Sequence, residues 1–297
     1  MFNRQGPRAG WRIILYLSQV LLLWEAGNAV LDRVLPAPER DAPSFPQMFV
    51  TEALRFAAVF LPALVMARLE SRASGDYGLP AGSRFGARFW HGVLLGIVQI
   101  SVLIGSIALF GGYRLGPLAL DGVTMLRWAL LWALFFALVG LFEEFAFRGY
   151  LQFTLADGIG FWPAASLLSF GFGCVHLLNR GESKVGALSV VAIALVFALA
   201  LKRTGNLWLA VGWHAAFDFG ETFLYSVPNS GIVYEHHLTD AVLHGPVWLT
   251  GGTVGPEGSA FSFLTMAAAA LYVHKVFPSG KTAGTDQENS AAASPAS

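Results

Sequence analysis

Apolar stretches of about the length that crosses a lipid bilayer recur along this sequence, and they constrain its fold more than any other feature. A helix needs about 20 residues to cross the hydrocarbon core. Lipid cannot hydrogen-bond backbone groups, and the alternation typical of a barrel strand is absent, so we expect helices. The sequence therefore predicts an all-α, polytopic membrane helix bundle with about eight transmembrane helices. Their approximate limits are residues 12–31, 49–67, 90–110, 126–153, 161–178, 186–201, 206–225 and 258–276.

The domain organisation follows from composition. Hydrophobic residues make up 55% of the chain and charged residues only 13%, about half the charged fraction of an ordinary soluble domain. We find no internal repeat and predict one multi-span membrane domain over residues 1–278. Residues 279–297 are small and polar, which predicts a disordered C-terminal tail. The glycine-rich stretch 251–259, GGTVGPEGS, lacks the lysine of a P-loop and is predicted to be a turn before the last helix.

The distribution of positive charge predicts the orientation. The formal net charge is zero, so it gives no indication of a nucleic-acid partner, and we expect none. Alternating the spans from a cytoplasmic N-terminus places twelve Lys and Arg residues inside and seven outside. Residues 226–257, placed outside, contain neither type. We therefore expect an integral membrane protein with both termini in the cytoplasm and the lipid bilayer as its surroundings. Its composition and short loops are typical of a bacterial cell-membrane protein.

Two further features bear on processing and on metal binding. Arg4, Arg8 and Arg12 before an apolar run could form a signal peptide. A retained helix is the better interpretation, because no A-x-A-like site follows and seven further spans already require insertion. The single cysteine, Cys174, excludes an intramolecular disulfide and a CxxC metal site.

Glu143, Glu144 and Arg148 lie within one predicted span, where each ionisable residue costs at least about 2.5–3.5 kcal/mol to insert. Glu144 and Arg148 are four residues apart and share a helix face, which predicts a structural ion pair. Glu143 points about 100° away from that face. It is therefore left over, and a carboxylate without a partner in a low-dielectric setting is suited to proton transfer.

Other ionisable residues on later spans can converge on Glu143. His176 lies near the end of the fifth span, and His214 and Asp218 are four residues apart on the seventh. Each has a simpler explanation: His176 could hydrogen-bond a nearby carbonyl, and His214 with Asp218 could form a local buried pair. Together they indicate a site around water inside the bundle, because the simpler explanations require unrelated coincidences.

The segments EEFAFR (143–148), FGCVH (172–176) and HAAFD (214–218) resemble the three motifs of the CPBP family of intramembrane proteases, EExxxR, FxxxH and HxxxN/D. That family includes the CAAX prenyl proteases and bacterial proteins linked to bacteriocin processing or immunity. The resemblance covers about residues 120–225. It implies an eight-helix membrane enzyme that needs no metal or other cofactor and cleaves membrane-associated peptides or proteins through a glutamate-activated water.

The resemblance also implies roles for the residues at the motif positions. Glu143 would be the general base, and His176 would help to hold the water. Glu144 would pair with Arg148, and His214 together with residue 218 would stabilise the oxyanion. An ionised Asp218 cannot donate a hydrogen bond. It is therefore either protonated or accepts from His214 and orients that ring, and we favour the orienting role.

Straight helices with these limits place Glu143 near the middle of the membrane and His176 near the outer end of its span, so the two should not meet without a bend or a tilt. Two other functions remain open. One is a catalytically silent membrane scaffold or immunity factor, and the other is an ion-coupled transporter. No inverted repeat supports the transporter.

Overall fold

A computed structural model describes all residues except 1, 4–5, 8, 35–43 and 278–297, so the predicted tail lies outside the described residues. The described chain is 74% helical with almost no strand, which confirms the predicted all-α class. The main helices are α1 (Ala9–Val34), α2 (Phe45–Leu69), α3 (Ala87–Leu109), α4 (Gly122–Arg148), α5 (Tyr150–Ile159), α6 (Phe161–His176), α7 (Lys184–Thr204), α8 (Trp208–Phe219) and α10 (Ala260–Val276). The short elements are β1 (Phe2–Asn3), β2 (Gly6–Pro7), η1 (Ala81–Ser83), β3 (Tyr113–Arg114), η2 (Gly220–Leu224), β4 (Val242–Leu243), α9 (Val247–Thr250) and η3 (Pro256–Gly258).

The predicted count of eight spans is not confirmed. Five helical segments of the described chain are long and apolar enough to cross a membrane: α1, α2, α3, α7 and the nearly continuous pair α4–α5. The helices α6, α8 and α10 have 16, 12 and 17 residues. At 1.5 Å per residue they reach only about 18–26 Å, less than the roughly 30 Å of a hydrocarbon core. Their apolar composition led the sequence analysis to count them as spans.

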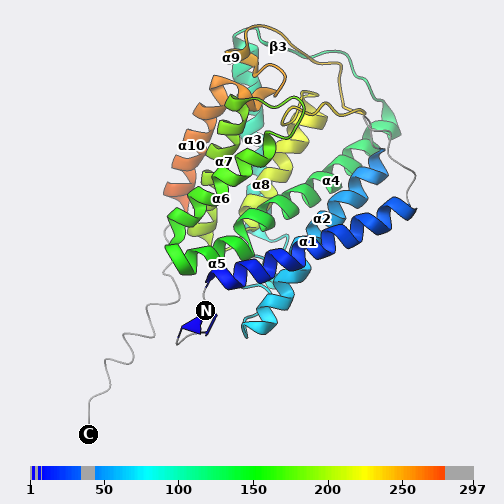
Figure 1. The fold of residues 1–297 in the computed structure, drawn as a ribbon. Helices are drawn as coiled ribbons and strands as arrows, with labels where there is room; N and C mark the ends of the chain where they lie inside the picture. Colours follow the sequence, from blue (N-terminus) through cyan, green and yellow to red (C-terminus); the bar gives the residue numbers. More distant parts are fainter. Residues whose placement is uncertain (1, 4–5, 8, 35–43, 278–297) are drawn as a thin grey trace.

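The helices form two groups (Figure 1). Helices α3, α6, α7, α8 and α10 run beside one another, and α1, α2 and α4 lie obliquely against them. Helix α4 joins the groups because it packs against both α2 and α8. The long connection after η2 contains strand β4, which pairs antiparallel with β3. The residues predicted to be catalytic lie on α4, α6 and α8, where the two groups meet.

Helices α3 and α8 have the most extensive contact of any helix pair in the described chain, and it is made through glycines. A Cβ atom at Gly92 would overlap the carbonyl oxygen of Leu209, and one at Gly96 would overlap that of Trp213. Gly212 on α8 faces the carbonyl of Phe89 in the same way. Small residues four apart allow the backbones of membrane helices to approach closely. The position of α8 is therefore set by main-chain contact with α3.

The chain bends twice between α4 and α6. Helix α4 ends at Arg148, where the amide of Gly149 donates to the carbonyl of Phe145 at 2.9 Å, and the helical path resumes as α5. Gly160 has a φ of +88°, a backbone conformation that glycine adopts readily, and it reverses the chain into α6. Helix α6 therefore packs against α4, which brings the FGCVH motif towards the first motif.

Candidate active site

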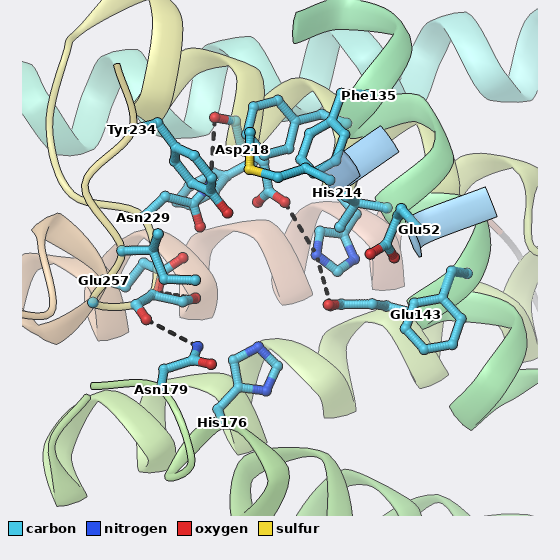
Figure 2. A pocket seen from close by; sticks show the side chains of 18 of the residues that line it. Glu52, Phe135, Glu143, His176, Asn179, His214, Asp218, Asn229, Tyr234 and Glu257 are labelled. Atoms are coloured by element: carbon cyan, nitrogen blue, oxygen red, sulfur yellow. Dashed lines mark hydrogen bonds and ion pairs between the residues drawn. The ribbon is translucent and has the colours of Figure 1, made fainter. Parts of the chain in front are cut away.

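A cavity of about 1320 Å³ lies between α2, α4, α6, α7 and α8, beside the loop that follows η2. All four residues predicted to be catalytic line it, namely Glu143, His176, His214 and Asp218. Figure 2 shows Glu143 and His214 on one side of the cavity and His176 across from them. Aromatic side chains cover another part of the wall: Phe45, Trp128, Trp132, Phe135, Phe136 and Tyr234. The cavity therefore has a polar part and an aromatic part.

The predicted ion pair of the first motif is present. Nη1 of Arg148 donates to Oε1 of Glu144 at 3.2 Å, and both side chains are buried. The guanidinium carbon of Arg148 also lies 4.6 Å from the centroid of the Phe172 ring on α6. The pair is incomplete, because Oε2 of Glu144 and Nη2 of Arg148 have no hydrogen-bond partner. This internal pair leaves Glu143 as the carboxylate of the motif that lines the cavity.

His214 is held by Glu144, a contact that the sequence analysis did not predict. Its Nδ1 lies 2.9 Å from Oε1 of Glu144, within hydrogen-bond distance. Its Nε2 lies 3.5 Å from Oε2 of Glu143 and 3.6 Å from Oδ2 of Asp218. The expectation that Asp218 orients His214 therefore needs correction. The orienting hydrogen bond is made by Glu144, and Asp218 faces the other ring nitrogen at a longer distance.

This contact fixes the tautomer of His214. The carboxylate of Glu144, paired with Arg148, can only accept a hydrogen bond, so Nδ1 of His214 must carry a proton. In a neutral ring, Nε2 is then an acceptor. Only the positively charged ring can donate through Nε2. Phe197 stacks on the ring, with centroids 5.5 Å apart, and restricts its rotation.

His176 makes a local contact and also faces the cavity. Its Nδ1 lies 3.0 Å from the carbonyl oxygen of Phe172, which is the simpler explanation considered for this residue. The carbonyl only accepts, so Nδ1 is the donor and Nε2 of the neutral ring is left as an acceptor. The expected separation in depth between His176 and Glu143 does not keep them apart, because both line one cavity. Helix α6 begins at the predicted residue, and its packing against α4 brings His176 to the cavity.

Two further carboxylates lie close to Asp218 and were not predicted from the sequence. Within the part of the chain that the structure describes, Asp218, Glu221 and Glu257 place oxygen atoms within 4.8 Å of one another. Glu221 follows Asp218 by three residues, a spacing that could have shown it. Glu257 lies in η3, within the stretch interpreted as a turn, and it lines the cavity. The group has no nitrogen or sulfur ligand, unlike a zinc site. Oxygen-only groups suit Ca²⁺ or Mg²⁺.

The comparisons with known proteins bear on the part of the chain that forms this site. Residues 125–220 match the family described as type II CAAX prenyl endopeptidase, Rce1-like. The match confirms the resemblance inferred from the motifs, and the Rce1-like segment contains all three of them. It includes most of α4, all of α5 to α8, and none of α1 to α3. None of the curated proteins matches the chain. Over this segment the chain is therefore similar to the intramembrane CAAX-type endopeptidases.

Proposed function

We propose that the protein is an intramembrane endopeptidase that hydrolyses peptide bonds of membrane-associated proteins or peptides with a water activated by Glu143, without a metal. The observation that carries the proposal is the unequal use of the two adjacent glutamates. Glu144 is taken up by Arg148 and His214, whereas Glu143 lines the cavity 3.5 Å from Nε2 of His214. The aromatic wall suits an apolar part of the substrate.

These positions support the following reaction. Glu143 accepts a proton from a water molecule whose other hydrogen is bonded to Nε2 of His176. The oxygen of the water attacks the carbonyl carbon, and the carbonyl oxygen becomes negatively charged. Positively charged His214, held by Glu144, donates through Nε2 to this oxyanion. When the C–N bond breaks, protonated Glu143 gives its proton to the leaving amine, and the carboxylate is restored.

Asp218 faces the same nitrogen of His214, so its ionised form favours the positively charged ring. Glu144 therefore sets the tautomer of His214, and Asp218 and Glu143 support the positive charge of its ring. The sequence interpretation assigned the orientation of His214 to Asp218, whereas here Glu144 orients the ring and Asp218 supports its charge.

The test is cleavage of a peptide library by the protein in lipid nanodiscs, followed by mass spectrometry. The Glu143→Gln variant should lose about 10²–10⁴-fold in rate, because it keeps the shape of the side chain and removes the base. Chelators should not abolish cleavage. Because Asp218, Glu221 and Glu257 form an oxygen-only group, zinc, Mg²⁺ and Ca²⁺ are each added back separately. Loss of activity on chelation with recovery by zinc would overturn the metal-free mechanism.

The same assay separates the remaining alternatives. A folded wild-type protein that cleaves no member of the library, and whose Glu143→Gln variant leaves the membrane peptides of the cell unchanged, would be a scaffold. Peptides that accumulate in cells carrying the Glu143→Gln variant would identify the substrates. Proton- or ion-dependent uptake into proteoliposomes without cleavage would indicate a transporter.

A further inference from the structure

Glu52 is a buried carboxylate that the proposed reaction does not use. It lies on α2, outside the Rce1-like segment, and is only 4% exposed. Its side chain lines the cavity, and Figure 2 shows it beside Glu143 and His214. A carboxylate on a helix long and apolar enough to cross a membrane is costly unless its oxygens have partners.

The partners of Glu52 satisfy only one of its two oxygens. Oε2 accepts from Nη1 of Arg55 at 3.0 Å, whereas Oε1 has no hydrogen-bond partner. The side chain of Arg55 is 47% exposed, and its guanidinium carbon also lies 5.9 Å from the centroid of the Trp24 ring on α1. Arg55 therefore has a second contact and access to solvent, and its pairing with Glu52 is easily exchanged for another cation.

The charges around the cavity favour a positively charged ligand. The described residues that line it include five carboxylates, against two guanidinium groups and the imidazole of His214, which the proposed reaction uses in its positively charged form. The carboxylates are Glu52, Glu143, Asp218, Glu235 and Glu257. Arg55 is at the side of Glu52, and the other guanidinium belongs to Arg180 on the connection after α6. A substrate cation that enters beside Glu52 gains an acceptor that the protein itself leaves unused.

We propose that Glu52 forms a subsite for a lysine or arginine side chain of the substrate, close to the scissile bond. The cation donates to Oε1 of Glu52, and Arg55 moves towards solvent and Trp24. The aromatic wall then holds the apolar residues that flank this cation. The position of this subsite close to a cleaved bond rests on the proposed function, whereas binding of the cation does not.

Binding is measured in the Glu143→Gln background, so that no peptide is consumed. Fluorescent apolar decapeptides in which lysine or norleucine occupies each position in turn are titrated into nanodiscs, and anisotropy gives the Kd. At one position or two neighbouring positions, lysine should bind about tenfold tighter than norleucine, as expected for a charge-assisted hydrogen bond. Glu52→Gln should remove this preference. Glu25→Gln, the same change on an exposed part of α1, should keep it.

Arg55→Gln separates the subsite from a purely structural ion pair. If Glu52 receives the substrate cation, removal of its competitor should increase the lysine preference. If the pair is only structural, the variant should lose stability without a change in preference. A lysine preference that persists in Glu52→Gln, or that is absent from the parent, would overturn the subsite. A preference that depends on Glu52 in a protein that cleaves nothing would leave the subsite standing and reject the proposed function.

Discussion

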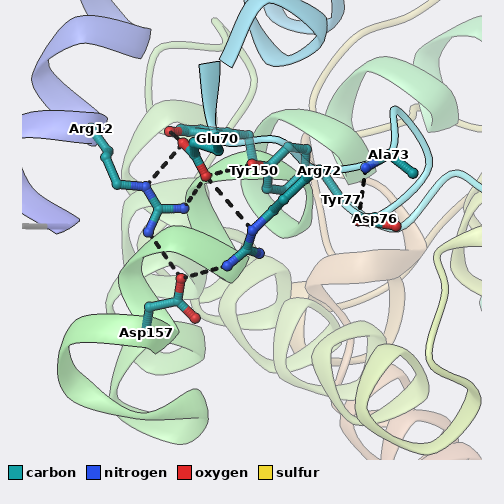
Figure 3. Close-up of polar contacts among 8 residues, drawn as sticks. All are labelled: Arg12, Glu70, Arg72, Ala73, Asp76, Tyr77, Tyr150 and Asp157. Atoms are coloured by element: carbon teal, nitrogen blue, oxygen red, sulfur yellow. Dashed lines mark hydrogen bonds and ion pairs between the residues drawn. The ribbon is translucent and has the colours of Figure 1, made fainter. Parts of the chain in front are cut away.

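The polar contacts around Glu70 are complete, whereas those around His214 are not. Oε1 of Glu70 accepts from Nε of Arg12 at 2.9 Å and from the hydroxyl of Tyr150 at 2.6 Å. Its Oε2 accepts from Nη2 of Arg12 and from the hydroxyl of Tyr77 at 2.7 Å. Figure 3 shows this network, in which Asp157 bridges Arg12 and Arg72. It joins the beginning of α1 to the end of α2 and to α5.

At and behind the cavity wall, buried polar atoms are left without partners on four side chains: Glu52 and Gln99, which line the cavity, and Glu144 and Arg148, which do not line it but hold His214. Buried polar groups are normally hydrogen-bonded, so each exception needs a reason. Around Glu70 the reason for burial is structural, because the donors come from separate helices and hold them together. At Glu52 and Gln99, which line the cavity, water and substrate can supply the missing partners. The comparison predicts that substitutions around Glu70 affect stability, whereas those that face the cavity affect turnover.

The largest expected effect is at Arg148, which does not line the cavity but pairs with Glu144, the residue that holds His214. Arg148→Ala leaves Glu144 buried without its cation and should lower the free energy of unfolding by about 3–5 kcal/mol. Glu143→Gln should leave it unchanged. Both are measured by denaturant unfolding in detergent micelles. Equal stability of the two variants would contradict the division between Glu144 and Glu143.

A smaller effect is expected at Glu70. Glu70→Gln replaces two charge-assisted acceptor oxygens by one neutral oxygen and should lower the free energy of unfolding by about 1–3 kcal/mol. Cleavage per folded molecule should not change. Asp157→Asn is the matched control, because the Asp157 side chain is 44% exposed and should contribute less. A loss of turnover without loss of stability in Glu70→Gln would break the comparison.

The contribution of Glu70 to stability should depend on pH. Burial opposes ionisation of Glu70, but hydrogen bonds from Arg12, Tyr150 and Tyr77 outweigh it and lower the pKa of this carboxyl below its ordinary value of 4.5. A lowered pKa contributes stability that is fully present above the unfolded-state pKa and is lost as the pH falls through the folded-state value. The melting temperature of the wild type should therefore fall more steeply below about pH 4.5 than that of Glu70→Gln.

The smallest effect is expected at Asp218. Because Glu144 already fixes the ring of His214, Asp218→Asn removes only a charge that supports the positively charged form. The value of kcat/KM should fall about tenfold, and its alkaline limb should move to lower pH. Profiles of kcat/KM from about pH 5 to 9 report apparent pKa values that belong to His214 and its neighbouring carboxyl groups together. Undiminished activity across that range would instead mean that Asp218 is protonated and donates to the oxyanion.

Local spacing predicted the parts of the site that lie on one helix. The four-residue interval between Glu144 and Arg148 predicted their ion pair, and the three motifs predicted which residues share the cavity. The contact between Glu144 and His214 joins residues 70 positions apart and depends on how α4 packs on α8. Helix-face arguments assign only neighbours on the same helix, so they gave the orienting role to Asp218.

The difference between local and long-range information also explains which features of the fold were predicted. Hydropathy located the helical segments, but it does not locate the points where the backbone hydrogen-bond pattern is interrupted. These points are Gly149, the turn at Gly160, and the π-helical segment η2 at the end of α8. The segment η2 ends α8 at Phe219, and α6 runs only from Phe161 to His176, so both helices are shorter than a full span. The G-x-x-x-G spacing of Gly92 and Gly96 was a signal that could have shown how closely α3 and α8 pack.

That close packing has a genetic consequence. Gly96 touches the main chain at Trp213, the residue before His214, and neither Gly92 nor Gly96 lines the cavity. A methyl group at either position must push α8 away from α3 and carry the imidazole with it, and a shift of about 1 Å in a catalytic group can cost about a hundredfold in rate. In a screen of random substitutions, these two glycines would therefore be recovered with the same phenotype as Glu143, although no substrate atom reaches them.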